Sequence, residues 1–313
     1  MAFAFVFPGQ GSQSVGMLAE IADSYPVVRE TFASASKILD LDLWRVIQEG
    51  PEERLNRTQI TQPAMLTAGV ALWRVWDEEG GPMPTYLAGH SLGEYTALTC
   101  AQSLQFEDAV AIVAERGRLM QEAVPEGLGA MAALLGLEDE QVRAVCEQAA
   151  QGGVVAAVNF NSPGQVVIAG DSSAVARALQ LATEAGAKRA VQLPVSVPSH
   201  CSLMESAAEK LAAKLNEIEI STPKIPTIQN VDAEVAKDPA RIREKLCQQL
   251  YRPVLWVDSV RYMIDEGVNT VIECGPGKVL AGLCKRISRE VNALSFYDPA
   301  TLEKAIARAE EDS

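Results

Sequence analysis

The segment TYLAGHSLGEYTALTC, residues 85–100, gives the clearest indication of how the chain folds around a reactive side chain. A short apolar run ends at Gly89, glycines flank Ser91 on both sides at a spacing of two, and a stretch with the apolar spacing of a helix follows. A strand, a sharp turn at a serine and a helix in this order are typical of a nucleophile elbow, where the serine hydroxyl stands at a helix N-terminus. Backbone N–H groups at such an end can stabilise an oxyanion. In the alternative interpretation, Ser91 only caps the helix, since serine is a favoured N-cap.

Short apolar runs and helical stretches also alternate toward both ends of the chain. The expected strands there cover 2–7, 85–89, 225–230 and 270–274, and the expected helices cover 62–78, 92–102, 106–121, 202–217, 239–265 and 299–311. Alternation of this kind is typical of an α/β fold with a mainly parallel sheet.

The middle of the chain has a different order of elements. Between residues 129 and 193 the pattern predicts a strand, a helix, two strands, a helix and a strand. This β-α-β-β-α-β order is that of a ferredoxin-like unit. We therefore expect a ferredoxin-like subdomain at 125–197, inserted into an α/β catalytic domain that residues 1–124 and 198–313 form together.

The charge balance limits the partners that the chain can bind. Its 313 residues include 27 Lys and Arg against 41 Asp and Glu, so the formal net charge at pH 7 is −14. Phosphate contacts need an excess of basic side chains on one surface, so binding to nucleic acid is not expected. Hydrophobic residues make up 48% of the chain, which is enough for a large core, and the length predicts about two domains.

The cysteines and apolar runs indicate a reducing, aqueous compartment. The six cysteines are scattered and include no Cys-x-x-Cys pair, which argues against disulfides and against a metal site. The apolar residues 2–7 stop at Pro8 and Gly9 and follow no basic segment, so they predict a buried strand rather than a signal peptide. No run approaches the roughly 18 apolar residues of a membrane helix. We expect a cytoplasmic protein that binds neither a metal nor a membrane.

Only two histidines, His90 and His200, are available as a base for Ser91. Neighbours at a strand end point to opposite faces, so His90 is poorly placed, and His200 is the base by elimination if the chemistry is of the Ser–His type. His200 lies in a Pro-containing loop before an amphipathic helix, and loops at the ends of elements often contain catalytic residues. Taken without Ser91, a single histidine there is more often a core or helix-start residue.

Arg116 falls on the apolar stripe of the expected helix 106–121, four residues after Ile112 and seven after Ala109. A buried guanidinium keeps its charge and needs an anionic partner. An internal Asp or Glu is the commoner partner. The functional alternative is the carboxylate of a substrate, held by two parallel N–H bonds.

The glycine-rich segment PGQGSQ, residues 8–13, follows the first expected strand but matches neither nucleotide-binding motif. It lacks the third glycine of Gly-x-Gly-x-x-Gly and the Lys-Ser or Lys-Thr of a phosphate-binding loop. What remains is a tight turn with bare backbone amides, one of which is suited to an oxyanion hole.

Eight segments, in this order, resemble those of the malonyl-CoA:acyl carrier protein transacylases of bacterial type II fatty acid synthesis. They are PGQGSQ at 8–13, TQPA at 61–64, GHSLGEYTAL at 89–98, ERGRLMQ at 115–121, NFNSPGQ at 159–165, SVPSHCSLM at 196–204, QLYRPVLW at 249–256 and ECGPGKVL at 273–280. The resemblance extends over nearly the whole chain and implies a hydrolase-like α/β core with a ferredoxin-like insertion. That architecture agrees with the pattern read from the residues.

Position by position, the resemblance implies roles for the candidate residues. Ser91 becomes the nucleophile and His200 the general base and acid. The main-chain carbonyl of Gln249 accepts from the other ring nitrogen of the histidine, and Arg116 binds the free malonyl carboxylate. The other implied positions are Gln10 and Leu92 as backbone donors of the oxyanion hole, Asn159 and Asn161 near the pantetheine arm, and Lys188 and Arg189 at the carrier protein.

The implied activity is a ping-pong transfer of malonyl from malonyl-CoA, the substrate, to the phosphopantetheine thiol of acyl carrier protein through malonyl-Ser91. The resemblance implies no permanently bound cofactor, and we expect a monomer. Three alternatives stay open. They are a serine hydrolase or thioesterase with the same elbow, an acyltransferase that supplies a polyketide pathway, and a non-catalytic acyl-binding scaffold.

Both implied partners, coenzyme A and the carrier protein, are acidic, and so is the chain itself. We therefore expect basic residues to gather around the mouth of the site, with Lys188 and Arg189 joined by Lys285 and Arg286. The overall repulsion should keep the encounter with the carrier protein brief and sensitive to salt.

Overall fold

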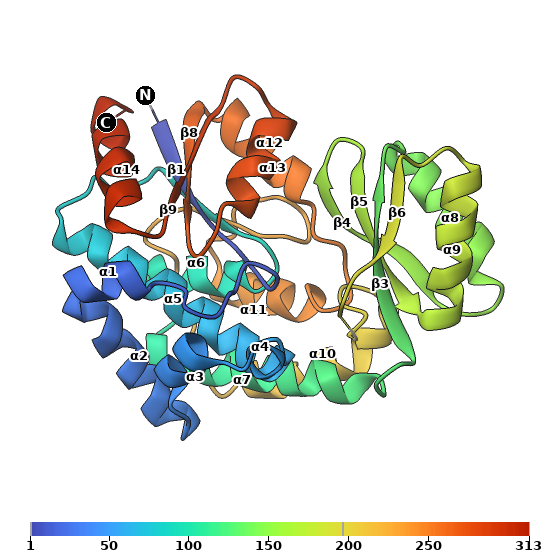
Figure 1. Cartoon of the computed structure of the whole chain (residues 1–313), viewed down its shortest axis with the longest axis horizontal. Coiled ribbons are helices and arrows are strands. Elements are labelled where there is room, and N and C mark those ends of the chain that lie inside the picture. The colour runs from blue at the N-terminus through green and yellow to red at the C-terminus, as the bar shows by residue number, and fades with distance from the viewer. Residues whose placement is uncertain (1, 196, 313) are drawn as a thin grey trace.

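Two β-sheets organise the chain and lie in two units that Figure 1 shows side by side. The computed structural model describes residues 2–195 and 197–312. Ser196, the first residue of the segment 196–204 quoted above, lies outside the described residues. The larger unit contains both ends of the chain, blue and red in Figure 1, and the smaller unit comes from the middle, green to yellow.

In the described part of the chain, the larger unit is built on a parallel sheet of five strands. In order across the sheet they are β7 (Thr227–Ile228), β2 (Tyr86–Gly89), β1 (Ala2–Phe7), β8 (Val268–Cys274) and β9 (Asn292–Phe296). Each strand runs parallel to its neighbours. The prediction of an α/β core with a mainly parallel sheet is confirmed.

Helices cover both faces of this sheet because side chains alternate along β1. Phe3, Phe5 and Phe7 point into one core, and Ala4 and Val6 point into another. The first core includes side chains of α1 (Ala19–Ser24), α2 (Pro26–Leu39), α3 (Leu43–Glu49), α4 (Glu52–Leu55), α5 (Thr58–Glu78), α6 (Gly93–Cys100), α7 (Phe106–Ala123), α10 (Glu205–Leu215), α11 (Pro239–Gln248) and α14 (Pro299–Asp312). The second core includes side chains of α12 (Trp256–Asp265) and α13 (Val279–Ile287). Among the described residues, no helix combines the length and the apolar character needed to cross a membrane.

The smaller unit has the element order that the sequence pattern predicts. It consists of β3 (Gly129–Leu135), α8 (Asp139–Ala150), β4 (Val155–Ser162), β5 (Gln165–Asp171), α9 (Ser172–Glu184) and β6 (Arg189–Gln192). Its strands form an antiparallel sheet in the order β4-β5-β3-β6, which is a ferredoxin-like arrangement. Helices α8 and α9 pack on one face, and Met131, Val158 and Val167 on the other face pack with Cys201, next to His200.

The prediction of a single helix at 239–265 was wrong. Between α11 and α12 the chain is irregular, and Val254 exchanges backbone hydrogen bonds with β4 instead of forming helical ones. Pro253 explains the break, because proline lacks an N–H and disfavours helical backbone at the residue before it. The break also places the main chain after α11 against the loop of His200, whose N–H donates to the carbonyl of Leu250 at 2.8 Å.

Candidate active site

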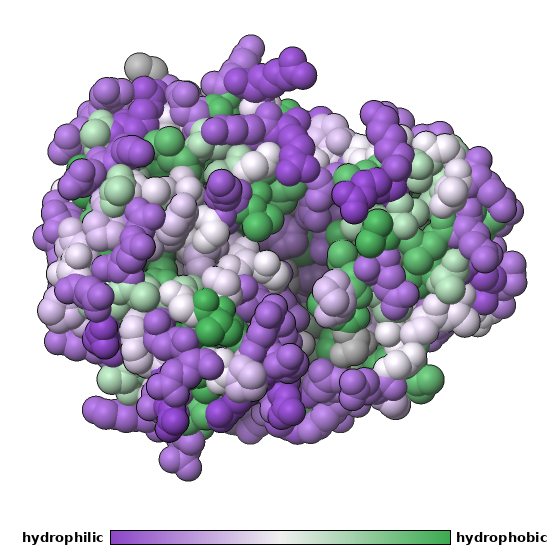
Figure 2. Space-filling view, in the orientation of Figure 1, coloured by the Kyte–Doolittle hydropathy of each residue, from purple (hydrophilic) through white to green (hydrophobic). Residues whose placement is uncertain are grey.

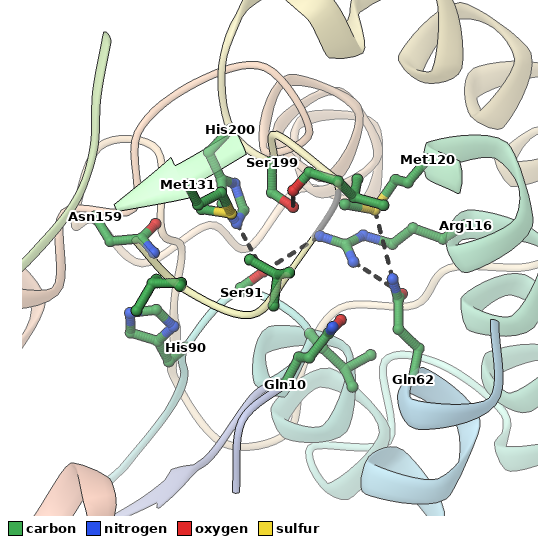
Figure 3. A pocket seen from close by; sticks show the side chains of 14 residues that line it. Gln10, Gln62, His90, Ser91, Arg116, Met120, Met131, Asn159, Ser199 and His200 are labelled. Atoms are coloured by element: carbon green, nitrogen blue, oxygen red, sulfur yellow. Dashed lines mark hydrogen bonds between the residues drawn. The ribbon is translucent and has the colours of Figure 1, made fainter. Parts of the chain in front are cut away.

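A pocket opens where the carboxyl ends of β1 and β2 face the smaller sheet. Figure 2 shows the surface hollowed between the two units, and Figure 3 shows the side chains that line the pocket. The smaller unit contributes Met131 and Asn159, and the loop residues Leu193, Val195 and Val197 add apolar surface. Polar groups of the larger unit make up most of the remainder. Apolar walls around a few convergent polar groups are typical of small-molecule sites.

Ser91 occupies the turn between β2 and α6 with a positive φ of 53°. The turn is tight, because a Cβ on Gly89 would lie 1.8 Å from the backbone of Gly93, and a Cβ on Gly93 would lie 2.0 Å from the carbonyl oxygen of Phe7. Glycine is required at both positions, which explains the Gly-x-Ser-x-Gly spacing. Asn230 holds the turn closed, since its side chain accepts from the N–H of Ser91 at 2.7 Å and donates to the carbonyl of Gly89 at 2.6 Å.

The side chains of Ser91 and His200 contact each other directly, as Figure 3 shows. Oγ of Ser91 lies 2.8 Å from Nε2 of His200, and Nδ1 of the same ring lies 2.6 Å from the main-chain carbonyl oxygen of Gln249. A carbonyl oxygen only accepts, so Nδ1 carries the proton and Nε2 accepts from the serine hydroxyl. The three groups have the geometry expected of a nucleophile, a base and an orienting acceptor.

The surroundings of His200 keep its imidazole neutral. The residue is 3% exposed, and burial lowers its pKa to about 3. The positive charge of Arg116 contributes to this lowering of the pKa, whereas the hydrogen bond to the Gln249 carbonyl opposes it. At neutral pH the ring is therefore unprotonated, which is the state that can accept the proton of Ser91.

His90 lies on the opposite side of Ser91 from Arg116 in Figure 3. Its Nε2 lies 2.8 Å from Oδ1 of Asn161, and burial lowers its pKa. Of the two asparagines expected near a pantetheine arm, Asn159 lines the pocket together with His90, and Asn161 contacts the ring of His90 but does not line the pocket.

Arg116 reaches the pocket from α7 and is 1% exposed. Its guanidinium donates to the side-chain oxygens of Gln62 at 2.8 Å and Gln249 at 2.9 Å, and its Nη2 lies 3.4 Å from Oγ of Ser91. The guanidinium also lies 5.5 Å from the ring centroid of Tyr95. Within residues 2–195 and 197–312, no Asp or Glu forms an ion pair with Arg116. Neutral amides thus hold the cation beside the nucleophile, which suits it to an anionic ligand.

Gln10 and Leu92, the expected donors of the oxyanion hole, both line the pocket. Leu92 directly follows Ser91 and is the N-cap of α6. The N–H of His90 donates to the carbonyl of Phe7 at 3.0 Å, so the end of β1 lies against the elbow, and Gln10 follows three residues later. The two backbone positions therefore flank the serine from two different segments of the chain.

Lys188 and Arg189 lie outside the pocket and are exposed at the start of β6. Leu135 of β3 pairs with Arg189 on one side and with Gln165 on the other, and Gln165 accepts from Nη1 of Arg286 at 2.6 Å. The structure thus gathers these basic residues at one end of the smaller sheet and not beside Ser91.

Three further residues contact the predicted ones, although the sequence reasoning gave them no role. They are Gln62, Glu94 and Asn230. Gln62 and Glu94 stand inside two of the quoted segments, 61–64 and 89–98. Asn230 is a polar residue at the carboxyl end of an expected strand, which is where parallel sheets place functional groups.

Known proteins share this sequence and this structure over nearly their whole length. The acyl transferase domain family matches residues 4–301. The malonyl CoA-acyl carrier protein transacylase of Escherichia coli K12 is 57% identical over 304 residues, which cover 97% of this chain and 98% of that protein.

Solved structures are equally similar. The malonyl CoA-acyl carrier protein transacylase of Coxiella burnetii superposes with a TM-score of 0.98 at 51% identity, over 99% of this chain and 98% of that one. A malonyl-transacylase in complex with its type II PKS acyl-carrier protein has a TM-score of 0.97 at 52% identity, over 98% of this chain and 100% of that one. The chain therefore belongs to the acyl transferase domain family and, within it, to the malonyl CoA-acyl carrier protein transacylases.

Proposed function

We propose that the chain transfers a malonyl group from malonyl-CoA to the phosphopantetheine thiol of an acyl carrier protein, through a malonyl ester of Ser91, in fatty acid synthesis. The observation that carries this proposal is the buried guanidinium of Arg116, 3.4 Å from Oγ of Ser91 and held by amides. A cation beside the nucleophile suits an acyl group that ends in a carboxylate. The names of the relatives support the same acyl group and acceptor.

In the first half-reaction, Oγ of Ser91 attacks the thioester carbon of malonyl-CoA while Nε2 of His200 takes the hydroxyl proton. The thioester oxygen gains negative charge, which the N–H groups of Gln10 and Leu92 stabilise. The C–S bond then breaks, and His200 gives the proton to the departing thiolate of coenzyme A. Ser91 is left as a malonyl ester whose free carboxylate pairs with Arg116.

In the second half-reaction, the pantetheine thiol of the carrier protein gives its proton to His200 and attacks the ester carbon. The bond to Ser91 breaks, and His200 returns the proton to the serine oxygen. The carbonyl of Gln249 holds the same tautomer through both halves, although it gives the imidazolium less electrostatic help than a carboxylate. In the first half-reaction that help is sufficient, because a thiolate leaves more readily than an amine.

The remaining assignments follow from this scheme. Asn159 lines the pocket from the smaller unit and is placed to contact the pantetheine arm, with Asn161 acting through His90. Every group in the scheme comes from one chain, so a monomer without a bound cofactor suffices. The second candidate function is the transfer of malonyl to the carrier protein of a polyketide pathway. The similarity to a malonyl-transacylase in complex with a type II PKS acyl-carrier protein favours it.

The test is to mix the protein with malonyl-CoA and measure its intact mass. We expect a malonyl adduct that Ser91→Ala abolishes and that disappears, with transfer to the pantetheine thiol, when holo carrier protein is added. A serine hydrolase would instead release malonate without a lasting adduct. Equal transfer by Ser91→Ala and by the wild type would show that the protein is a scaffold, and no transfer from the adduct would exclude the transferase.

A further inference from the structure

Glu94 is a buried acid directly beneath the site, and the two half-reactions do not use it. It lies in the first turn of α6 and is 0% exposed. Its Oε2 accepts from Nε2 of Gln249 at 2.8 Å and from the N–H of Asn230 at 2.9 Å. Its Oε1 is buried without a hydrogen-bond partner. Burying a carboxyl group is unfavourable unless its contacts compensate, so the position needs an explanation.

The side-chain amide of Gln249 connects this acid to the arginine. Its nitrogen donates to Glu94 and also to the carbonyl of Ser91 at 2.9 Å, and its oxygen accepts from Nη2 of Arg116 at 2.9 Å. An amide can be turned by half a rotation, which would place its NH₂ group against the guanidinium. Since two N–H donors point at Oε2, this oxygen is an acceptor in either protonation state of Glu94. The acid, together with the carbonyl of Ser91, therefore fixes which end of the amide faces Arg116.

The same arrangement keeps the acid off the arginine. One amide separates the carboxyl group of Glu94 from the guanidinium, and its dipole is aligned with the NH₂ toward the acid and the oxygen toward the cation. A direct ion pair would occupy the N–H groups that a substrate carboxylate needs. Burial raises the pKa of Glu94 to about 7, with Gln249, Asn230 and Arg116 opposing the rise.

We propose that Glu94 is a positioning residue for acyl selectivity, because it fixes the amide of Gln249 in the orientation that holds Arg116 toward Ser91. The proposal rests on the proposed function, since it assigns Arg116 to the malonyl carboxylate. Glu94 contacts neither the acyl group nor the reacting atoms. Its effect on the reaction passes through Gln249 to the arginine.

The test compares malonyl-CoA with acetyl-CoA, whose acyl group has no carboxylate. Formation of the acyl-Ser91 ester is followed by mass in single turnover for each substrate. In Glu94→Ala the amide of Gln249 keeps the carbonyl of Ser91 but loses Glu94, its other acceptor, so the ratio of malonyl to acetyl kcat/KM should fall at least about tenfold, mainly through KM for malonyl-CoA. In Glu94→Gln the amide oxygen can accept both hydrogen bonds, so the ratio should stay within about threefold of the wild type.

Gln249→Met is the second variant, because it removes the side-chain amide and keeps the main-chain carbonyl that orients His200. It should lower the same ratio, and the double variant with Glu94→Ala should lower it no further than about twofold beyond either single change. Thermal unfolding identifies the folded variants. If Glu94→Ala does not fold, the selectivity ratio of Gln249→Met alone tests the proposal.

The outcomes separate the two proposals. A wild type that forms no malonyl-Ser91 would overturn the proposed function. If the wild type forms it, an unchanged ratio in folded Glu94→Ala or in Gln249→Met would overturn the role of Glu94, as would an equal loss for malonyl and acetyl or additive effects in the double variant. A selective and non-additive loss would support that role.

Discussion

At the scale of single residues, His200 should make acylation insensitive to pH where an ordinary histidine titrates. Burial and the charge of Arg116 lower its pKa from 6.5 to about 3, so the ring stays neutral and basic well below pH 6.5. We expect the rate of acetyl-Ser91 formation in single turnover to stay constant from about pH 8 down to about pH 5. Acetyl-CoA is the substrate of choice because its acyl group carries no titrating carboxyl.

Arg116→Ala is the control for this pH profile. Removing the cation should raise the pKa of His200 and move the acid limb of the profile to higher pH. A wild-type acid limb centred at pH 6.5, the ordinary pKa of histidine, would contradict the assignment.

The lowered pKa of His200 also sets how stability depends on pH. The pKa in the folded state lies below that in the unfolded state, so the unfolded chain binds more protons, and the free energy of unfolding falls as the pH drops from 6.5 toward 3.

Arg116 should decide which acyl group the enzyme accepts. Arg116→Ala removes a charge-assisted interaction, so we expect a loss on the order of 2 to 5 kcal/mol for malonyl-CoA, which is about 30-fold or more in kcat/KM. The rate with acetyl-CoA should fall less or rise. Arg116→Lys keeps the charge but cannot donate to both Gln62 and Gln249 through a rigid fork, so its loss should be intermediate. Equal losses for both substrates would show that Arg116 is structural.

At the scale of elements, the elbow depends on the absence of a side chain at the start of α6. In Gly93→Ala the new Cβ would lie 2.0 Å from the carbonyl oxygen of Phe7, and backbone cannot move aside as a side chain can. We expect a loss of about 3 kcal/mol in the free energy of unfolding, measured in urea. Gly282→Ala is the matched control inside α13, where the nearest atom is the end of the Arg286 side chain at 3.7 Å, and it should add about 0.5 to 1 kcal/mol. Similar effects of the two changes would contradict this account.

Elements with a clear period were predictable from the sequence. The strand at 2–7 and the order of elements in the smaller unit are examples. Helices α1, α3 and α4 were missed because elements of four to seven residues contain too few turns to show a helical period. Helix α2 was missed as well, although its 14 residues are long enough to show one. Strand β9 was missed because it lies at the edge of the sheet and contains the polar residues Asn292 and Ser295, so its pattern resembles a loop.

The sequence predicted the site residues whose side-chain type is itself informative. It predicted much less about main-chain acceptors and about contacts between residues far apart in the sequence. Scarcity of histidine and the position of Arg116 on an apolar stripe pointed to the residues that the structure brings to Ser91. Gln249 needed the family resemblance, because a main-chain acceptor has no sequence signature. Glu94 lies in a quoted segment and Asn230 at the end of an expected strand, but neither position reveals their mutual contact, which joins residues 136 positions apart and exists only once the sheet has formed.

At the scale of the whole molecule, the pocket combines two units with different contributions. The larger unit supplies Ser91, His200 and Arg116, all fixed by hydrogen bonds within that unit. The smaller unit supplies Met131 and Asn159 from the face of its sheet that helices leave uncovered. Under the proposed function, acyl recognition would therefore depend on the larger unit, and the smaller one would cover the arm that carries the acyl group. Boundaries of the smaller unit at 125–197 stay a prediction.

The uneven distribution of charge leads to the last prediction, which concerns the carrier protein. The chain carries a net charge of −14, yet Lys188, Arg189 and Arg286 all lie at one end of the smaller sheet. An acidic partner approaching an acidic protein is steered by such a local patch. In the double variant Lys188→Glu with Arg189→Glu, we expect KM for the carrier protein to rise at least about tenfold and to lose much of its dependence on salt.

The control is the double variant Lys37→Glu with Lys304→Glu, which makes the same change in net charge at exposed positions of α2 and α14 in the larger unit. Its KM for the carrier protein should change by less than about threefold, because screening limits the reach of a distant charge to about 10 Å. Both pairs should leave the formation of malonyl-Ser91 from malonyl-CoA nearly unchanged, since neither pair lies in the pocket. Equal effects of the two pairs on KM would mean that net charge alone governs the encounter. A loss of acylation in Lys188→Glu with Arg189→Glu would instead assign that patch to coenzyme A.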